Sequence, residues 1–590
     1  MGKSLLSRTI PAVAEAVDHV IGWHRLPSVL GIPTLFAIRS RLREQNLFDP
    51  GDYRQPLDKQ PGPWVNWRNI EGRFNDLTSP LMGSVGSRFG RNVPPACTHP
   101  EKPPDILSPD PYVVSDELLA REQFRPAGLN VLAAAWIQLE VHDWFDHGSP
   151  VAGDPWDPDR PDWPGPAKPP IKRTCPAAKG AGPAAFTSHD THWWDGSQLY
   201  GREQRWVDAI RADGGKLKTP DELIGALGDL VDPAGSAANL WAGSLVLSAL
   251  FVLEHNAICD ALVKHERRRW TPDALFHTAR LINAALMTKI HWLEWSVAVL
   301  HHPALRRGLP MNWWGLLEPI TKRLGRLGPS AFLFGIPGSP TEHHGVPYCL
   351  TEEFVAVYRL HWLMPDDLWF YESPGGGRPV HFGLLDLIGP AKIPAALKQI
   401  GGFDDALYSL GIAPAGAPRL HNYPTTLRNL IKPDATGQDE RLDLAAIDIL
   451  RDRERGVPRY NLFRQLFHLP PIDSFEDLTP NPRWAREIRE VYEDDIDRVD
   501  LQIGLLVEPP PRGFAVSDTA FRVFLLMASR RLASDRFLTA CYNRGTYTPT
   551  GMDWIRANDL KSVLTRHFPS LKPALRGVRN PFFTWPASDG

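Results

Sequence analysis

The sequence predicts a mainly α-helical protein with one large core and very little β structure. Apolar residues recur at helical spacing over long stretches, and no β pattern extends beyond a few residues. No internal repeat of fixed period is present. The 590 residues are 43% hydrophobic and 23% charged, which is ordinary for a globular enzyme. We therefore expect one helical catalytic unit rather than a string of modules.

The expected elements follow the chain in order. Residues 11–48 show helical periodicity with a proline break, and residues 50–115 are rich in Pro, Gly and Asn, which is typical of a loop region. The strongest helical pattern runs from Asn130 to Asp146, and a proline-rich stretch at 148–184 is expected to be a solvated loop. Further helices are expected at 237–266, 272–302, 351–362 and 519–532.

We divide the chain into two parts. Residues 1–115 are expected to hold N-terminal helices and the extended loop region, packed on the core. Residues 116–590 are expected to form the catalytic domain, with the proline-rich loop inside it.

Composition excludes several classes of protein. The net charge of −3 gives no broad basic field, so we expect no nucleic-acid partner. The five cysteines are scattered and form no CxxC pair, which argues against a disulfide framework and a zinc site. We see no signal peptide and no apolar run long enough for a membrane span. We expect a cytoplasmic protein, soluble or weakly membrane-associated, with peripheral contact through the N-terminal helices left open.

The helix over residues 130–146 carries a candidate catalytic pair. Gln138 and His142 are four residues apart, so they share one helical face and can point into one cavity. A histidine on the distal side of a haem can exchange protons with bound peroxide, and the glutamine can hydrogen-bond the same ligand. Taken alone, a helical histidine is more often a core or surface group.

Tyr358 and His361 form a second candidate pair. They are three residues apart in the predicted helix 351–362, which also places them on one face. The imidazole of His361 can ligate iron, and the phenol one turn earlier would lie near the porphyrin edge, where an oxidised haem could take an electron from it. The alternative is a helix end before Pro365, with Tyr358 as a core residue.

Oxygen donors at alternate positions form a candidate cation loop. Such hard ligands at close spacing, with a glycine that eases the turn, suit Ca²⁺. A calcium ion there would also fix the orientation of the helix that carries His142. The alternative is an Asx-rich turn without a metal. The donors are Thr191, Trp193 through its carbonyl, Asp195 and Ser197, with Asp143 as a further carboxylate.

Together these segments resemble the fatty acid α-dioxygenases of the haem peroxidase–cyclooxygenase superfamily. Each motif is weak alone, but the ordered set is specific and spans nearly the whole chain. The motifs are His142-Asp, Thr191-x-Trp-x-Asp-x-Ser197, Glu254-His-Asn, Tyr358-x-x-His361 and Asn422-Tyr-Pro.

The resemblance implies an animal-type haem peroxidase fold, with one haem b per chain between central helices and a bound Ca²⁺. His142 resembles the distal histidine and Gln138 its partner. His361 resembles the proximal iron ligand, and Asn422 would hydrogen-bond its imidazole. Tyr358 resembles the tyrosine that forms a radical.

The resemblance also implies a clamp for the substrate carboxylate. His291 resembles the histidine that helps to hold it, and Ser296 stands where the family usually has threonine. Arg531 is our choice for the arginine of the clamp, with Arg530 and Arg536 as competitors. In Glu254-His-Asn the family often has a preceding arginine, which is Leu253 here, and we expect His255 to be structural.

The implied function is the oxygenation of fatty acids at the α-carbon by a tyrosyl radical, with O2 as co-substrate and a peroxide activator. The product would be a 2-hydroperoxy fatty acid. Three alternatives stay open: a haem peroxidase for small reductants, a cyclooxygenase-like or diol-synthase-like oxygenase, and a non-catalytic haem-binding protein.

Overall fold

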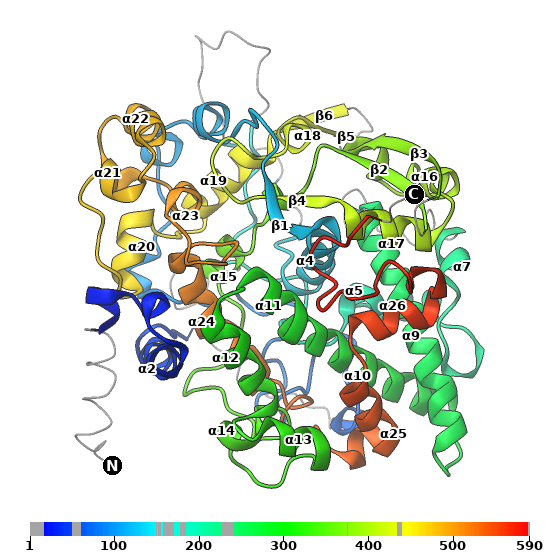
Figure 1. Ribbon diagram of the computed structural model, residues 1–590. Coiled ribbons are helices and arrows are strands. Elements are labelled where there is room, and N and C mark those ends of the chain that lie inside the picture. The colour runs from blue at the N-terminus through cyan, green and yellow to red at the C-terminus, as the bar shows by residue number, and fades with distance from the viewer. Residues whose placement is uncertain are drawn as a thin grey trace, which may run out of the picture.

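The computed structural model describes residues 17–49, 61–148, 150–151, 155–156, 170–177, 185–225, 240–373, 376–433 and 439–587. Helices dominate these ranges, and the strands form three separate two-stranded sheets (Figure 1). The prediction of a mainly α fold with little β structure is confirmed.

Five helices build the centre of the fold: α4 (Val131–Trp144), α9 (Ala242–His265), α10 (Pro272–Ile290), α17 (Phe403–Ile412) and α24 (Asp518–Ser534). Helix α4 packs against α9 and α17, and α9 packs against α10 (Figure 1). Side-chain caps begin three of these helices because each cap oxygen accepts an otherwise unpaired backbone N–H. The caps are Asn130 for α4, Thr271 for α10 and Ser517 for α24.

Most helix predictions are confirmed within small shifts at their ends. The predicted helix 272–302 continues beyond α10 through a π-helical turn, His291–Trp295, into α11 (Ser296–Val299). The start of the predicted helix 237–266 lies partly outside the described residues. Helix α9 is also long and apolar enough to cross a membrane, but 61% of its apolar window is buried, as in a core helix.

The N-terminal helix lies beside the C-terminal part of the chain. Helix α2 (Ser28–Gln45) packs against α12 (Pro303–Trp314) and α24 (Figure 1). Leu35 of α2 and Leu526 of α24 belong to the same core of buried apolar residues. The division at residues 115/116 stays a prediction.

The strands pair only in antiparallel sheets. Strand β1 (Pro126–Asn130) pairs with β4 (Pro414–Gly416), and β5 (Leu430–Pro433) pairs with β6 (Asp439–Leu442). The sequence analysis did not foresee the hairpin of β2 (Asp367–Glu372) and β3 (Gly376–Gly383), in which Leu368 pairs with Phe382.

Further helices complete the shell around this centre. They are α3 (Pro111–Val114), α5 (Ser197–Tyr200), α6 (Gln204–Ile210), α7 (Pro220–Gly225), α13 (Glu318–Leu324), α14 (Ala331–Phe334), α15 (Glu352–Val357), α16 (Ile393–Ile400), α18 (Thr425–Arg428), α19 (Leu444–Glu454), α20 (Tyr460–Leu466), α21 (Phe475–Leu478), α22 (Pro482–Val491), α23 (Leu501–Val507), α25 (Arg544–Ala557) and α26 (Leu560–His567).

The proline-rich stretch at 148–184 lies mostly outside the described residues. Its described parts are packed on the protein and are not fully solvated, which corrects that expectation for them. Trp156 pairs with Ile171 through the backbone, and its indole N–H donates to Glu454 of α19 over 2.9 Å.

Candidate active site

Helix α4 presents a narrow accessible stripe although it lies in the middle of the molecule. Its only residues that are not buried are Gln138, Val141 and His142, which share one face. Neither Gln138 nor His142 has a hydrogen-bond partner among the described residues. Partial burial of the imidazole within the fold lowers the pKa of His142, although the charge of Asp146 acts to raise it. An accessible, neutral imidazole inside the fold can accept a proton in a cavity.

The predicted helix over 351–362 ends earlier than expected. Helix α15 stops at Val357, Tyr358 is its C-cap, and His361 begins a short 3-10 turn. The prediction that Tyr358 and His361 share one helical face is therefore wrong. Pro365 has no N–H to donate to the carbonyl of His361, so an α-helix does not continue through this segment.

Strand β4 joins α4 to the turn that carries His361. The strand packs against both elements. A Cβ on Gly416 would lie 2.3 Å from the carbonyl oxygen of Trp362, so glycine is required where the strand and the turn touch. The same small element therefore fixes the positions of the two segments that hold His142 and His361.

His361 is held by helix α19. Its Nδ1 lies 2.7 Å from Oδ2 of Asp448, and 37% of its side-chain surface stays exposed. Burial disfavours the ionised form of Asp448, but His361 and Arg359 outweigh burial, and the pKa of Asp448 is lowered. An ionised carboxylate only accepts hydrogen bonds, so Nδ1 carries a proton. In the neutral form of this tautomer, Nε2 has the lone pair that an iron ligand requires.

The role predicted for Asn422 is wrong. Its amide donates to the carbonyls of Arg125 and Ala417 over 2.9 and 2.7 Å, and its oxygen accepts from the N–H of Arg125. All its polar atoms are therefore used in holding two backbone segments together. The next residue, Tyr423, is the one that reaches His361, with its hydroxyl 3.1 Å from Nδ1.

Trp144, the last residue of α4, contacts three side chains predicted for substrate chemistry. Its ring packs edge-on against Tyr358 and His291, with centroids 5.7 and 5.2 Å away. The guanidinium of Arg531 lies 4.2 Å from the same ring. Trp194 also contacts Arg531, at 4.1 Å. Neither tryptophan was predicted as a site residue, although Trp144 follows the His142-Asp pair directly.

The hydrogen bond of His291 fixes its tautomer. The indole N–H of Trp136 donates to Nδ1 of His291 over 3.1 Å, and an indole nitrogen can only donate. Burial, with a smaller effect of Arg531, holds the pKa of His291 well below its usual value. The neutral ring therefore carries its proton on Nε2, where it is a donor suited to a carboxylate.

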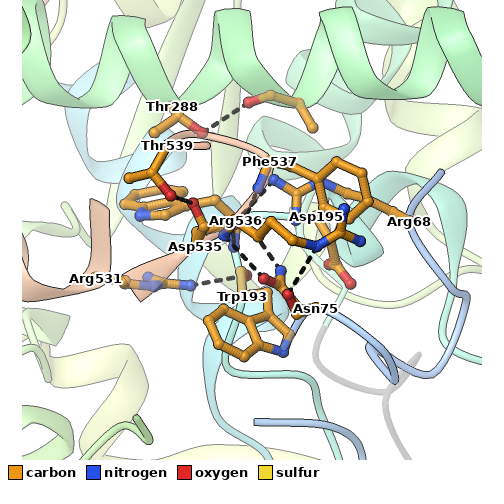
Figure 2. Close-up of polar contacts among 12 residues, drawn as sticks. Arg68, Asn75, Trp193, Asp195, Thr288, Arg531, Asp535, Arg536, Phe537 and Thr539 are labelled. Atoms are coloured by element: carbon orange, nitrogen blue, oxygen red, sulfur yellow. Dashed lines mark hydrogen bonds and ion pairs between the residues drawn. The ribbon is translucent and has the colours of Figure 1, made fainter. Parts of the chain in front are cut away.

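Arg531 is the candidate arginine that has a terminal guanidinium nitrogen to spare for a ligand. Arg531 donates to the carbonyls of His192 and Trp193, and its third nitrogen is buried without a partner among the described residues. Figure 2 shows Arg531 reaching the carbonyl of Trp193 while Arg536 is turned toward Asn75. Arg536 also donates to further backbone carbonyls, and Arg530 donates to the carbonyls of residues 343, 346 and 347.

A change in helix type brings His291 and Ser296 to the site. The π-helical turn His291–Trp295 separates α10 from α11, and π turns of this kind are frequent at functional sites. His291 stacks on Trp295 with centroids 4.7 Å apart. Ser296 follows the turn, and its buried hydroxyl has no partner among the described residues. That hydroxyl is a further free donor beside the clamp.

The candidate cation loop is buried and rich in unpartnered oxygen atoms. Among the described residues, one oxygen each of Asp143, Thr191 and Asp195 has no hydrogen-bond partner. Ser197 donates its hydroxyl to Asp143, and burial followed by Asp195 raises the pKa of Asp143 well above its usual value. Two adjacent buried carboxylates are costly without a cation.

Some features of the loop compete with a cation. Oδ2 of Asp195 lies 3.6 Å from the guanidinium of Arg280, and the carbonyl of Trp193 accepts from Arg531 over 3.1 Å. The described residues hold no cluster of three or more His, Cys, Asp or Glu side chains suited to a metal. The donor set, with two carboxylates, two hydroxyls and a carbonyl, still fits Ca²⁺, which prefers oxygen.

An apolar cavity adjoins Tyr358. Burial raises the pKa of the Tyr358 phenol, so it stays protonated at neutral pH. An apolar cavity beside a buried phenol suits a hydrocarbon chain. The lining residues are Trp295, Val299, Leu300, Val357, Tyr358, Leu360, Val516, Ala520 and Phe524.

His255 has the structural role expected of it. Its Nδ1 lies 2.9 Å from the hydroxyl of Tyr200, and its Nε2 lies 3.1 Å from the carbonyl of Gly215. Both ring nitrogens are used within the fold.

The comparison with protein families decides the classification of the chain. The model of the animal haem peroxidase family matches residues 67–579, which is most of the sequence. The chain belongs to the animal haem peroxidase family. Haem binding follows from this membership.

Within this family the chain is one of the α-dioxygenases. It is 37% identical to α-dioxygenase 1 of Capsicum annuum, over 99% of this chain and 93% of the relative. The crystal structure of the fatty acid α-dioxygenase of Oryza sativa matches 99% of this chain and 98% of that chain, with a TM-score of 0.90 and 35% identity. A tyrosine-to-phenylalanine variant of the rice enzyme with palmitic acid matches equally well. The predicted fold and the predicted dioxygenase class are confirmed.

Proposed function

We propose that the chain oxygenates long-chain fatty acids at the α-carbon, with Tyr358 as the radical-forming residue. The observation that carries this proposal is the contact of Trp144 with Tyr358, His291 and Arg531. Around the ring of Trp144 lie two groups that can donate hydrogen bonds to a carboxylate and one buried phenol. This arrangement suits a substrate whose reacting carbon is next to its carboxylate. The palmitic acid in the rice relative supports the choice of substrate.

We propose that His361 ligates the iron of one haem b and that His142 and Gln138 lie on its other side. The free Nε2 lone pair of His361 and the accessible, unpartnered imidazole of His142 fit these roles. When bound and activated by peroxide, the haem would supply the oxidant that takes an electron and the phenol proton from Tyr358. His142 moves the proton of the peroxide, which its neutral state permits.

The substrate is held by its headgroup. Arg531 donates from its free nitrogen, His291 from Nε2–H and Ser296 from its hydroxyl, so the carboxylate meets three donors in a dry site. The acyl chain lies in the apolar cavity lined by Val299, Leu300 and Val516. Fixing the headgroup places the α-carbon, rather than another carbon, against the phenol.

The chemistry at Tyr358 then balances. The phenoxyl oxygen takes a hydrogen atom from the α-carbon, which gives a phenol and a carbon radical. O2 adds to that carbon, and the resulting peroxyl takes a hydrogen atom back from the Tyr358 phenol. The product is a 2-hydroperoxy fatty acid, and the tyrosyl radical is regenerated.

We propose that the buried oxygens of Asp143, Thr191, Asp195 and Ser197, with the carbonyl of Trp193, hold Ca²⁺. Asp143 directly follows His142, so a bound cation would fix the end of α4. Arg531 donates to the carbonyl of Trp193, which links this loop to the carboxylate clamp.

The proposal is tested with Tyr358→Phe, which removes only the hydroxyl. The variant is expected to keep its Soret band and to lose O2 uptake with palmitate. Tyr460→Phe is the control: its hydroxyl donates to Glu508 over 2.9 Å, far from the clamp in sequence, and O2 uptake should persist. Normal oxygenation by Tyr358→Phe would refute the radical role, and guaiacol oxidation without palmitate oxygenation would favour a peroxidase.

A further inference from the structure

A second apolar groove lies between helices α2, α12 and α24. Each helix lines it with apolar residues and then, further along its own sequence, with one polar residue. The polar residues are Arg39 of α2, Asn312 of α12 and Ser529 of α24. The apolar lining includes Leu35, Phe36, Leu305, Leu309, Phe521 and Leu525.

The polar residues meet at one end of the groove. Arg39 donates to Oδ1 of Asn312 over 2.8 Å, and Arg43, one turn further along α2, donates to the hydroxyl of Ser529 over 2.8 Å. These hydrogen bonds join α2 to both other helices at the same place. The groove is therefore amphipathic, with apolar walls and a cationic end.

Neither arginine has a carboxylate of the described residues within ion-pair distance, although Glu342 acts on Arg43 from further away. Among the described residues Arg39 and Arg43 form no ion pair, and the Nε atom of each is buried without a hydrogen-bond partner. Buried guanidinium groups are ordinarily paired with an anion. Arg39 and Arg43 are half-buried, and each leaves its buried Nε atom without an acceptor, which an anion bound between them would supply.

The surroundings make this end of the groove strongly positive. Burial lowers the pKa of Arg39 to about 10. Burial is also the main cause that lowers the pKa of Arg43, and repulsion from Arg39 and Arg530 lowers it further. The negative charge of Glu342 acts in the opposite direction. The same three arginines, after burial, lower the pKa of His344. A bound carboxylate would relieve this mutual repulsion.

The groove adjoins the pocket beside Tyr358 at Phe524. Phe524 lines both spaces, and its ring stacks on Trp292, which lines the groove, with centroids 6.0 Å apart. This pair of rings forms the wall between the two spaces. A ligand in the groove is thus a separate molecule from one clamped at Arg531.

We infer that the groove binds a second long-chain fatty acid molecule, with its carboxylate at Arg39 and Arg43 and its alkyl chain along α2, α12 and α24. Guanidinium groups suit carboxylate, and the apolar walls suit the chain. The inference rests on the proposed function only for the choice of a fatty acid as the ligand. The site is distinct in position and in residues from the clamp at Arg531 and His291.

The test measures how many palmitate molecules bind to haem-loaded Tyr358→Phe protein, which does not consume the ligand. Equilibrium dialysis with labelled palmitate below its micellar concentration is expected to give about two equivalents per chain. Adding Arg39→Gln and Arg43→Gln should reduce this to about one, by weakening the second site about tenfold or more. Adding Arg531→Gln instead should remove the other equivalent.

Two controls keep the result interpretable. Arg41→Gln, on the same helix but bonded to Gln45, should retain both equivalents. Arg39→Lys keeps the charge in place and should retain the second equivalent. The Soret band of every variant reports folding, and if the double glutamine variant loses that band, Arg39→Met alone replaces it.

Other results would overturn the inference. A single equivalent that is insensitive to Arg39 would do so. The inference would also fail if substitution of Arg39 weakened the binding of hexadecanedioate but not of palmitate. The groove would then hold the second carboxylate of a molecule that is clamped at Arg531. Failure of the proposed function gives a different pattern, in which Arg531→Gln leaves palmitate binding unchanged while the Arg39 site persists.

Discussion

Asp448 of α19 lies 2.7 Å from Nδ1 of His361, although 87 residues separate the two in sequence. Tyr423 donates its hydroxyl to the same carboxylate oxygen over 3.1 Å. A carboxylate that accepts from a ligating histidine fixes its tautomer and raises its basicity. The position expected for Asn422 is thus taken by an ionised group, which should push more electron density toward a bound iron than an amide would.

Asp448→Asn is expected to reduce the electron donation from His361 to the bound iron. The midpoint potential of the haem iron should rise, and haem affinity should fall by about 10–100-fold, the usual effect of losing such a partner. Spectroelectrochemistry and haem titration measure both. Tyr423→Phe keeps the carboxylate and should have a smaller effect on both. Equal potentials in wild type and Asp448→Asn would show that Asp448 does not tune the iron.

Arg531→Lys is expected to raise KM for palmitate with little change in kcat at saturation. Lysine cannot bind the two carbonyls of His192 and Trp193 and a carboxylate in one plane. The loss of one charged hydrogen bond, about 1.5–3 kcal/mol, corresponds to about 10–150-fold in KM. Steady-state O2 uptake measures it.

Arg530→Lys is the matched control for Arg531. Arg530 is also buried, but it donates to the carbonyls of Val346 and Pro347. Its substitution should lower thermal stability and leave KM unchanged. The reverse pattern, with KM sensitive to Arg530 alone, would assign the clamp to the neighbouring arginine.

Local patterns in the sequence were sufficient to predict the helices that carry His142 and Arg531. Apolar spacing over α4 and α24, with cap residues Asn130 and Ser517, specifies helices whatever surrounds them. The choice of Arg531 among the three arginines stays a prediction, which its unpartnered terminal nitrogen supports. The other two arginines donate to backbone carbonyls from residues 64–75 and 343–347, which no local pattern reveals.

The errors share one physical cause, which is contact between distant segments. Arg359 and His361 both reach α19, and the residue that holds His361 comes from that helix. Asn422 and Tyr423 are neighbours whose side chains go to different places. The pattern of a single sequence shows neither the contacts of these residues with α19 nor the partners of the Asn422 and Tyr423 side chains.

Removal of calcium tests the proposed role of the loop at residues 191–197. If Ca²⁺ is present at 100 times its Kd, binding contributes about 2.7 kcal/mol, which for a chain of this length is about 2 °C in Tm. A chelator should therefore lower Tm by about that amount, and it should perturb the Soret band because Asp143 adjoins His142.

Two aspartates, one in the loop and one directly before it, distinguish the loss of bound calcium from a non-specific effect of the chelator. Asp195→Asn should abolish the response to chelator because it removes a carboxylate with an unpartnered oxygen. Asp190→Asn should retain the response because the Asp190 carboxylate is already bonded to Arg202. A Tm of the wild-type protein that is the same with and without chelator would argue against a bound Ca²⁺.

The buried cluster around Asp500 predicts a pH-dependent stability. Asp500 accepts from Arg453 at 2.8 and 2.6 Å and from Arg459 at 2.8 Å. Burial disfavours the ionised carboxyl, but Arg453 and Arg459 outweigh it, and the pKa of Asp500 is lowered in the folded protein. The stabilisation is therefore complete above the unfolded-state pKa of about 3.9 and is lost as the pH falls through the lower folded-state value.

Asp500→Asn removes the charge that Arg453 and Arg459 require, which should cost about 3–5 kcal/mol at pH 7. The difference in urea midpoint from wild type should be largest at neutral pH and should shrink as the pH falls below about 4, because the wild type alone loses this contribution. Asp497→Asn is the control, since Asp497 accepts from the amide of Asn461 rather than from an arginine. A midpoint difference that stays constant from pH 7 to strong acid would mean that ionisation of Asp500 is not what holds these arginines in place.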